Sequence, residues 1–226
     1  MRPVDKGVAP RDYTDYNDAR HDLAGRIGYF CSYCEMPVTN MIEVEHVHPI
    51  DNGGNPTDWN NLLLSCKYCN TVKKARNANR VGYLWPDVDN TDLTFEYSEI
   101  NAIEPKYNLP QHLKTYAQAT IKLMGLDRMP GGREEPTEAD TRWRSRKEVW
   151  DKANINLNRW NTKPCVEIAK IIADCAVLSG HYSIWCEVFK AIPQVLVEID
   201  REYRAKGLYK EFDATGRRII RQNANI

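Results

Sequence analysis

Four cysteines in two closely spaced pairs constrain this chain more than any other feature. The pairs have the form Cys-x-x-Cys, and their first members lie 35 residues apart: Cys31/Cys34 and Cys66/Cys69. Each pair can form a tight turn that points both sulfur atoms inward, so together they can present four thiolates to one zinc ion. A four-sulfur site has no open coordination position. The spacing therefore predicts structural Zn²⁺ that clamps a segment too small to hold a core alone.

The other three cysteines, Cys165, Cys175 and Cys186, lie in apolar, helical-looking sequence without a second pattern. We interpret them as small buried residues. Paired Cys-x-x-Cys motifs indicate zinc rather than disulfides in a reducing compartment. No stretch approaches the roughly 18 apolar residues of a membrane span, and the first residues lack the apolar core of a secretory signal. We expect a cytoplasmic protein with no membrane partner.

Charge limits how the chain can meet a polyanion. The 226 residues carry 31 basic and 31 acidic side chains, so the formal net charge is zero. This balance excludes a uniformly basic coat for nucleic acid, and any anion binding must be local.

Composition divides the chain near residue 107 into an α+β part and a mainly helical part. We predict an N-terminal extension over residues 1–25 that packs on the following domain, a clamped domain over 26–106, and a helical domain over 107–226. Turn residues and short strand-like runs are typical of the second part. Helix start and stop signals in the third predict four or five helices.

Between the clamped pairs lies a set of residues with the chemistry of phosphodiester hydrolysis. Glu45 and His46 come near the end of a predicted strand, Asn61 follows fifteen residues after His46, and Asn70 nine residues later. Hydrolysis of a phosphodiester needs a general base for water, a divalent ion to offset charge, and a group that orients the base. Each residue alone has an ordinary alternative, such as a surface histidine or a turn asparagine.

At these residues the chain resembles the HNH nuclease family, whose zinc-clamped beta-beta-alpha-metal motif reads acid-His-x-x-Pro, Asn-Leu, and Cys-x-x-Cys-Asn before a lysine-rich helix. The corresponding segments are Glu45–Pro49, Asn61–Leu62, Cys66–Asn70 and Lys73–Lys74. The resemblance covers about residues 28 to 80. It implies that His46 is the general base, that Glu45 and Asn70 hold one Mg²⁺ or Mn²⁺, and that Asn61 fixes the His46 ring or its loop. The chain carries Glu where the family more often has Asp or His, and Asn as the third letter of the motif name.

Basic residues follow the second cysteine pair. From Cys66 to Arg80 there are five basic side chains and no acid. We predict phosphate contacts from Lys73, Lys74, Arg76 and Arg80, with a solvated helix face as the alternative. Such contacts carry no sequence information, so sequence-specific cutting is not predicted.

A narrower resemblance extends over roughly residues 1 to 100. The segments Arg2–Gly7, Tyr29–Glu35 and Tyr83–Thr91 resemble the HNH component of Septu-type anti-phage defence systems, the PtuB nucleases, including versions associated with retrons. In such systems the nuclease works with the ABC/SMC-like ATPase PtuA. The helical part is the natural docking candidate for it, although Trp143, Trp150 and Trp160 fit core packing equally well.

Three functions stay open at this point. The leading hypothesis is a metal-dependent endonuclease of a defence assembly acting on nucleic acid, with DNA favoured and RNA such as tRNA as the alternative. The second is a non-catalytic, zinc-stabilised nucleic-acid-binding or adaptor module. A homing or restriction enzyme ranks third, because the C-terminal part is a mixed-charge bundle rather than a basic DNA-reading element.

Overall fold

The computed structural model describes residues 1–99, 103–204, 212–222 and 224–225. In chain order the regular elements are α1 (Ala19–Ile27), β1 (Glu43–His46), β2 (Leu62–Ser65), α2 (Lys67–Lys73), β3 (Phe95–Tyr97), β4 (Ile103–Pro105), α3 (Gln111–Met124), α4 (Arg142–Thr162), α5 (Val166–Ser179), α6 (Tyr182–Val188) and α7 (Pro193–Arg204). The strands form two antiparallel pairs, β1 with β2 and β3 with β4. The prediction of small sheets followed by a helical C-terminal region is confirmed.

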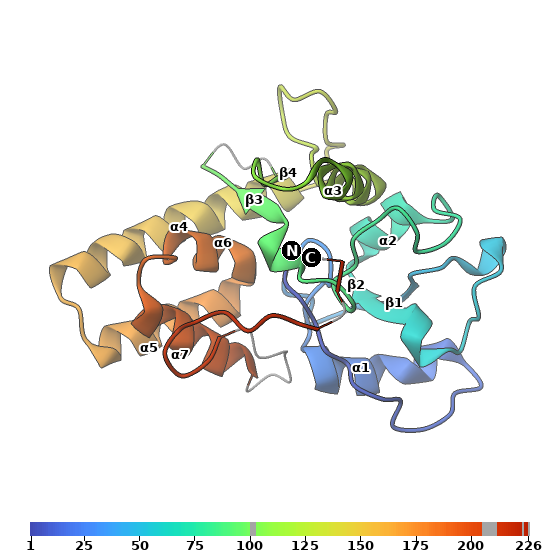
Figure 1. Ribbon diagram of the computed structural model, residues 1–226, viewed down its shortest axis with the longest axis horizontal. Helices are drawn as coiled ribbons and strands as arrows, with labels where there is room; N and C mark the ends of the chain where they lie inside the picture. Colours follow the sequence, from blue (N-terminus) through green and yellow to red (C-terminus); the bar gives the residue numbers. More distant parts are fainter. Residues whose placement is uncertain (100–102, 205–211, 223, 226) are drawn as a thin grey trace.

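Helices and strands gather on different sides of the molecule. In Figure 1 the helices α4 to α7 lie on one side, while α1, β1, β2 and α2 lie on the other. The pair β3–β4 lies between these groups and α3 lies above α2. Among the described residues, no helix is long and apolar enough to cross a membrane.

The strand β2 is buried on both faces, and its sequence explains why. Leu62, Leu63 and Leu64 are each fully buried. Successive side chains of a strand point to opposite faces, so three leucines in a row require cover on both sides. Both α1 and α2 contact β2. β2 is therefore enclosed by helices, and β1, which carries Glu45 and His46, pairs with it.

The first residues pack against this strand pair. Val4 N donates to Pro86 O (2.8 Å). The ammonium of Lys6 donates to Trp59 O (2.8 Å) and Leu62 O (2.7 Å). Burial lowers the pKa of Lys6, and the nearby Asp87 carboxylate acts in the opposite direction. Lys6 thus binds the N-terminal segment to the backbone at Leu62, the first residue of β2.

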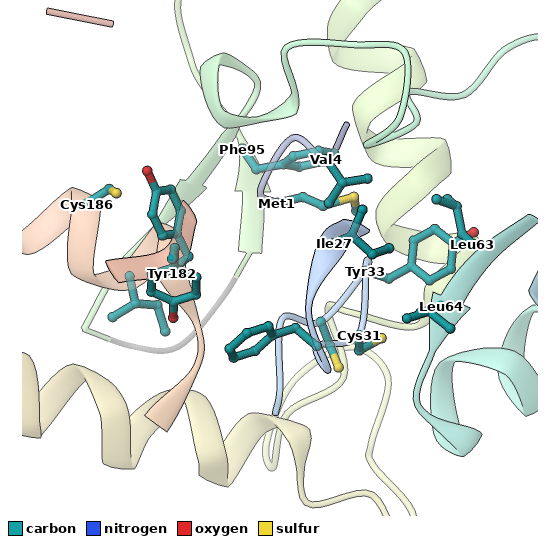
Figure 2. Packing of buried hydrophobic residues seen from close by; sticks show 14 of the residues in the cluster. Met1, Val4, Ile27, Cys31, Tyr33, Leu63, Leu64, Phe95, Tyr182 and Cys186 are labelled. Carbon is teal, nitrogen blue, oxygen red and sulfur yellow. The ribbon is translucent and has the colours of Figure 1, made fainter. Parts of the chain in front are cut away.

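The buried core crosses the predicted boundary near residue 107. One cluster of buried side chains contains Met1, Cys31 and Leu64 together with Tyr182 and Cys186 of the helical part. Figure 2 shows these side chains converging from the N-terminal segment, the cysteine turn, β2 and α6. The helical part is therefore packed against the clamped part, while the domain boundary itself stays a prediction.

A polar contact fastens α6 to the first cysteine turn. Both oxygens of Glu35 accept hydrogen bonds from Ser183, one from its N–H (2.8 Å) and one from its hydroxyl (2.6 Å). His181 N donates to Glu35 O (2.9 Å). Burial lowers the pKa of His181 to about 4, so its ring is neutral at physiological pH.

The tryptophans of α4 mostly serve packing. Trp150 and Trp160 are partly buried and pack against the core cluster. Trp143 is half-buried. The core alternative therefore holds for Trp150 and Trp160, and these rings do not form an unpartnered face.

Gly180 offers a direct test of how closely α5 and α6 approach the cysteine turn. Its φ is +68°, and an added Cβ would lie 2.6 Å from Glu35 O and 2.6 Å from Pro37 Cδ. Gly82 has φ +85° and open space around it, so it is the matched control for backbone strain. We expect Gly180→Ala to lower the free energy of unfolding by about 1–3 kcal/mol more than Gly82→Ala, because overpacking adds to strain. Urea denaturation measures both, and equal losses would contradict the close approach.

Candidate active site and metal clamp

The four predicted zinc ligands meet at one point. Their Sγ atoms all lie within 4.8 Å of one another, and they come from Cys31, Cys34, Cys66 and Cys69. The first two lie in the turn before β1, and the last two lie at the start of α2. Ser32 N donates to Leu64 O (2.9 Å), which ties the first turn to β2. The clamp therefore joins both strands and the helix.

The chemistry of this donor set fits zinc. Hydrogen bonding with the Cys31 thiol raises the pKa of Cys34 and Cys69, and burial adds to both shifts. Hydrogen bonds from the same thiols lower the pKa of Cys66. One thiolate therefore forms readily, and each further thiolate is repelled by it unless a cation lies between them. Zn²⁺ supplies that charge and binds the thiolate form. With four sulfur ligands the ion would be structural.

Arg142 connects the clamp to the helical part. Its side chain is 3% exposed, and its Nη1 donates to Cys69 Sγ (3.3 Å). The same guanidinium donates to Met124 O (2.8 Å) and Gly125 O (2.9 Å), and it pairs with Asp140 (2.7 Å). One buried cation thus joins the end of α3, the start of α4 and a predicted zinc ligand.

The zinc assignment predicts one Zn²⁺ per chain that depends on Cys69 and not on Cys175. We expect Cys69→Ser to lose the ion and to unfold at lower temperature, because metal binding and folding are coupled in such clamps. Cys175→Ser, on α5, is the matched control and should keep full zinc content. Elemental analysis with thermal denaturation measures both, and a metal-free wild type would rule out the clamp.

We expect the Arg142 side chain to slow the release of zinc from the clamp. Partners of metal ligands typically change metal affinity by 10–100-fold when they are removed. We expect Arg142→Met to speed zinc transfer to a chromogenic chelator at least about tenfold. Arg144→Met, two residues along α4 and paired with exposed Glu148, is the control and should transfer zinc at the wild-type rate. Equal rates for both variants would contradict the link.

Two side-chain contacts run between β1 and α2. Asn70 Nδ2 donates to Glu43 Oε2 (2.7 Å), and Lys73 Nζ pairs with Glu45 Oε1 (2.5 Å). Residues two apart on a strand share a face, as do residues three apart on a helix. The two acids of β1 therefore face the two polar residues of α2, one contact beside the other.

The contact of Glu45 is fully buried. Glu45 and Lys73 are each 1% exposed. Glu45 Oε2 accepts a hydrogen bond from the Tyr33 hydroxyl. Burial, with the Glu45 charge adding, raises the pKa of Tyr33 well above its ordinary value, so the phenol keeps its proton. Lys73 Nζ also donates to His46 O (2.6 Å). Both oxygens of Glu45 are thus occupied by protein groups.

The ring of His46 is held from two sides. Its Nε2 lies 2.9 Å from Pro56 O, and Tyr16 contacts the ring edge-on with 4.7 Å between centroids. A carbonyl oxygen only accepts, so Nε2 carries the proton and Nδ1 of the neutral ring is the acceptor. His46 is half-buried. In the neutral form of the ring, this contact leaves Nδ1 with the free lone pair that a general base needs.

Asn61 holds the loop after His46 and not the ring itself. Its Oδ1 accepts from His48 N (2.7 Å), and its Nδ2 donates to His48 O (2.9 Å) and Asn55 O (2.9 Å). The next residue after Asn55 is Pro56, whose carbonyl fixes the His46 ring. Of the two roles predicted for Asn61, the contacts match the loop.

An open hollow of about 570 Å³ brings several of these residues together. Its walls include Glu45, His46, Asn70 and Lys74. Lys74 is exposed and has a φ of +45°, a backbone conformation that favours glycine. Strained residues of this kind cluster at functional sites.

Of the four basic residues predicted to contact phosphate, three have protein partners. Lys73 is buried against Glu45. Arg76 donates to backbone carbonyls of α2 and α3, and Arg80 pairs with Asp87 (2.8 Å). Lys74 alone of the four lines the hollow. The stretch is therefore not a uniformly free basic face, because most of its charge is used within the fold.

Several residues around the site escaped sequence reasoning. Glu43 carried a usable signal, because it alternates with Glu45 on the strand while Asn70 and Lys73 lie three apart on the helix. Tyr16 and the Pro56 carbonyl carried no sequence signal, since their contacts with His46 depend on how the loops fold in three dimensions. Arg142 lies 73 residues from the cysteine that it contacts.

Comparison with known families agrees with this geometry. A family model described as HNH endonuclease matches residues 31–76, which run from the first zinc ligand to just beyond α2. The match includes both cysteine pairs, His46, Asn61 and Asn70. It supports an HNH nuclease domain in this segment and, with it, a hydrolase acting on nucleic acid. No curated protein matches the chain.

Proposed function

We propose that this protein is a metal-dependent HNH endonuclease that hydrolyses phosphodiester bonds, with His46 as the general base. The observation that carries the proposal is the orientation of His46. Its Nε2–H is held by Pro56 O at 2.9 Å, and the residue lines a hollow that Asn70 and Lys74 share. The HNH match over residues 31–76 supports the same reaction class.

In this proposal His46 moves one proton. Nδ1 accepts it from a water molecule whose oxygen attacks phosphorus, and the bond from phosphorus to the leaving oxygen breaks. The ring becomes an imidazolium, and its Nε2–H bond to Pro56 O strengthens because the donor is now charged. Asn61 is a positioning residue, since it fixes the loop that carries this carbonyl.

A divalent ion, Mg²⁺ or Mn²⁺, would offset the charge on the phosphate and the leaving oxygen. Asn70 fits as a ligand, because no partner for its amide oxygen is found among the described residues and the residue lines the hollow. Glu45, which the family pattern pairs with it, lines the same hollow. Lys73 and Tyr33 each contact one of its oxygens, and each carboxylate oxygen has a second lone pair for an ion. Lys74 is the proposed phosphate contact, and Lys73, Arg76 and Arg80 would first have to leave their protein partners.

The finer proposal is a Septu-type anti-phage complex with the ATPase PtuA. It rests on the narrower resemblance, whose first and last segments contact each other: Val4 N donates to Pro86 O, and Lys6 pairs with Asp87. A net charge of zero also favours a partner that contributes to holding nucleic acid. Exposed apolar side chains on α5, Ile171 and Leu178, lie seven residues apart on one helix face and could receive such a partner.

The decisive variant is His46→Ala. Loss of a general base typically costs 10²–10⁴-fold in rate, so we expect at least about a 100-fold drop in cleavage with zinc content unchanged. Plasmid DNA and total tRNA, with Mg²⁺ or Mn²⁺, serve as substrates, with and without the ATPase. His112→Ala, at an exposed position on α3, is the matched control and should cut at the wild-type rate.

The outcomes separate the hypotheses. The substrate that disappears decides DNA against RNA, and a requirement for the ATPase supports the defence complex. Nucleic acid that is bound but never cut, by zinc-loaded wild type under every condition, would favour the non-catalytic adaptor module instead.

A further inference from the structure

Glu43 was assigned no role by the HNH pattern, yet it is the acid that touches Asn70. Its Oε2 accepts the hydrogen bond from Asn70 Nδ2 at 2.7 Å. Glu43 is half-buried, whereas its strand neighbour Glu45 is sealed at 1% exposure. The two acids of β1 therefore have different surroundings, and only one of them faces the proposed metal ligand.

A carboxylate selects which end of an amide it faces. An ionised Glu side chain only accepts hydrogen bonds, while an Asn side chain has a donating NH₂ end and an accepting oxygen end. The contact with Glu43 thus requires that Asn70 present its Nδ2. The oxygen, Oδ1, is then the end left for other partners, and no partner for it is found among the described residues.

This orientation matters because the two ends of the amide have opposite affinities for a cation. Mg²⁺ and Mn²⁺ bind oxygen donors and are repelled by the positive end of an NH₂ group. Without a neighbour that distinguishes them, Asn70 could present either end to the hollow that it lines. The neighbouring Lys73 cannot orient the Asn70 amide, since its ammonium is held by Glu45 and His46 O.

We propose that Glu43 is a positioning residue of the site: it fixes the amide of Asn70 so that Oδ1 faces a divalent cation. This inference rests on the proposed function for the identity of the ion. It concerns the side-chain pair itself, and a binding measurement without nucleic acid tests it separately from cleavage.

The experiment measures Mn²⁺ binding to the zinc-loaded full chain by electron paramagnetic resonance, with zinc content and thermal midpoint as checks of folding. Removing a group that orients a metal ligand typically weakens affinity 10–100-fold. We expect Glu43→Ala to weaken Mn²⁺ binding at least about tenfold. Glu43→Gln can offer Asn70 either an oxygen or an NH₂ group, so it no longer selects one end, and its affinity should fall between those of wild type and Glu43→Ala. Glu104→Ala, on β4, is the control for loss of one negative charge at an exposed position.

A double variant gives the sharpest test. In Asn70→Asp both ends of the side chain are oxygens, so orientation no longer matters. In that background Glu43→Ala should leave Mn²⁺ binding unchanged or strengthen it, because a neighbouring like charge is removed. A tenfold loss there as well would overturn the inference and make Glu43 a ligand through its charge.

Two further outcomes distinguish this inference from the nuclease proposal. If wild type binds Mn²⁺ with the expected variant pattern but cuts nothing, the inference stands and the nuclease proposal fails. If wild type cuts but binds no Mn²⁺ in the absence or presence of a non-cleavable substrate, the inference fails and the nuclease proposal stands.

Discussion

The arrangement of this protein depends on four sulfur atoms held within 4.8 Å of one another. The segment between them offers few elements: two strands of four residues each and one helix of seven. Elements this short do not form an independently stable unit in water. Zinc binding at the clamp would supply the missing free energy and hold α2 across β1. The polar pairs between α2 and β1 then follow, because their spacing depends on that packing.

The rest of the chain is built onto the clamp and is not separate from it. Arg142, at the start of α4, donates a hydrogen bond to Cys69 Sγ, and Glu35 accepts a hydrogen bond from Ser183 of α6. Arg142 and Glu35 are each 3% exposed, so breaking either contact is costly because it leaves a buried charged group without a partner. The helical part therefore contacts the predicted zinc clamp through buried side chains and is packed against it.

Some residues of the candidate site hold other residues in place, and others line the hollow. Glu45 and Lys73 form a buried pair under the strand, and Asn61 secures the loop. His46 and Asn70 then face the hollow from fixed positions. A histidine whose ring is held by a carbonyl needs little reorganisation when it takes up a proton, which is the condition for efficient base catalysis.

The sequence by itself determined the cysteine clamp and the order of two strands and a helix, because cysteine spacing and hydrophobic runs are local patterns. It also placed Glu45, His46 and Asn70 among the candidate residues, and these line the hollow. Only the tertiary structure decided which polar groups are free. Lys73 and Glu45 are charged residues in the sequence, yet burial turns them into each other's partners. The link from Arg142 to Cys69 was likewise beyond prediction, since contacts over long sequence separations depend on how helices pack and leave no periodic signal in the chain.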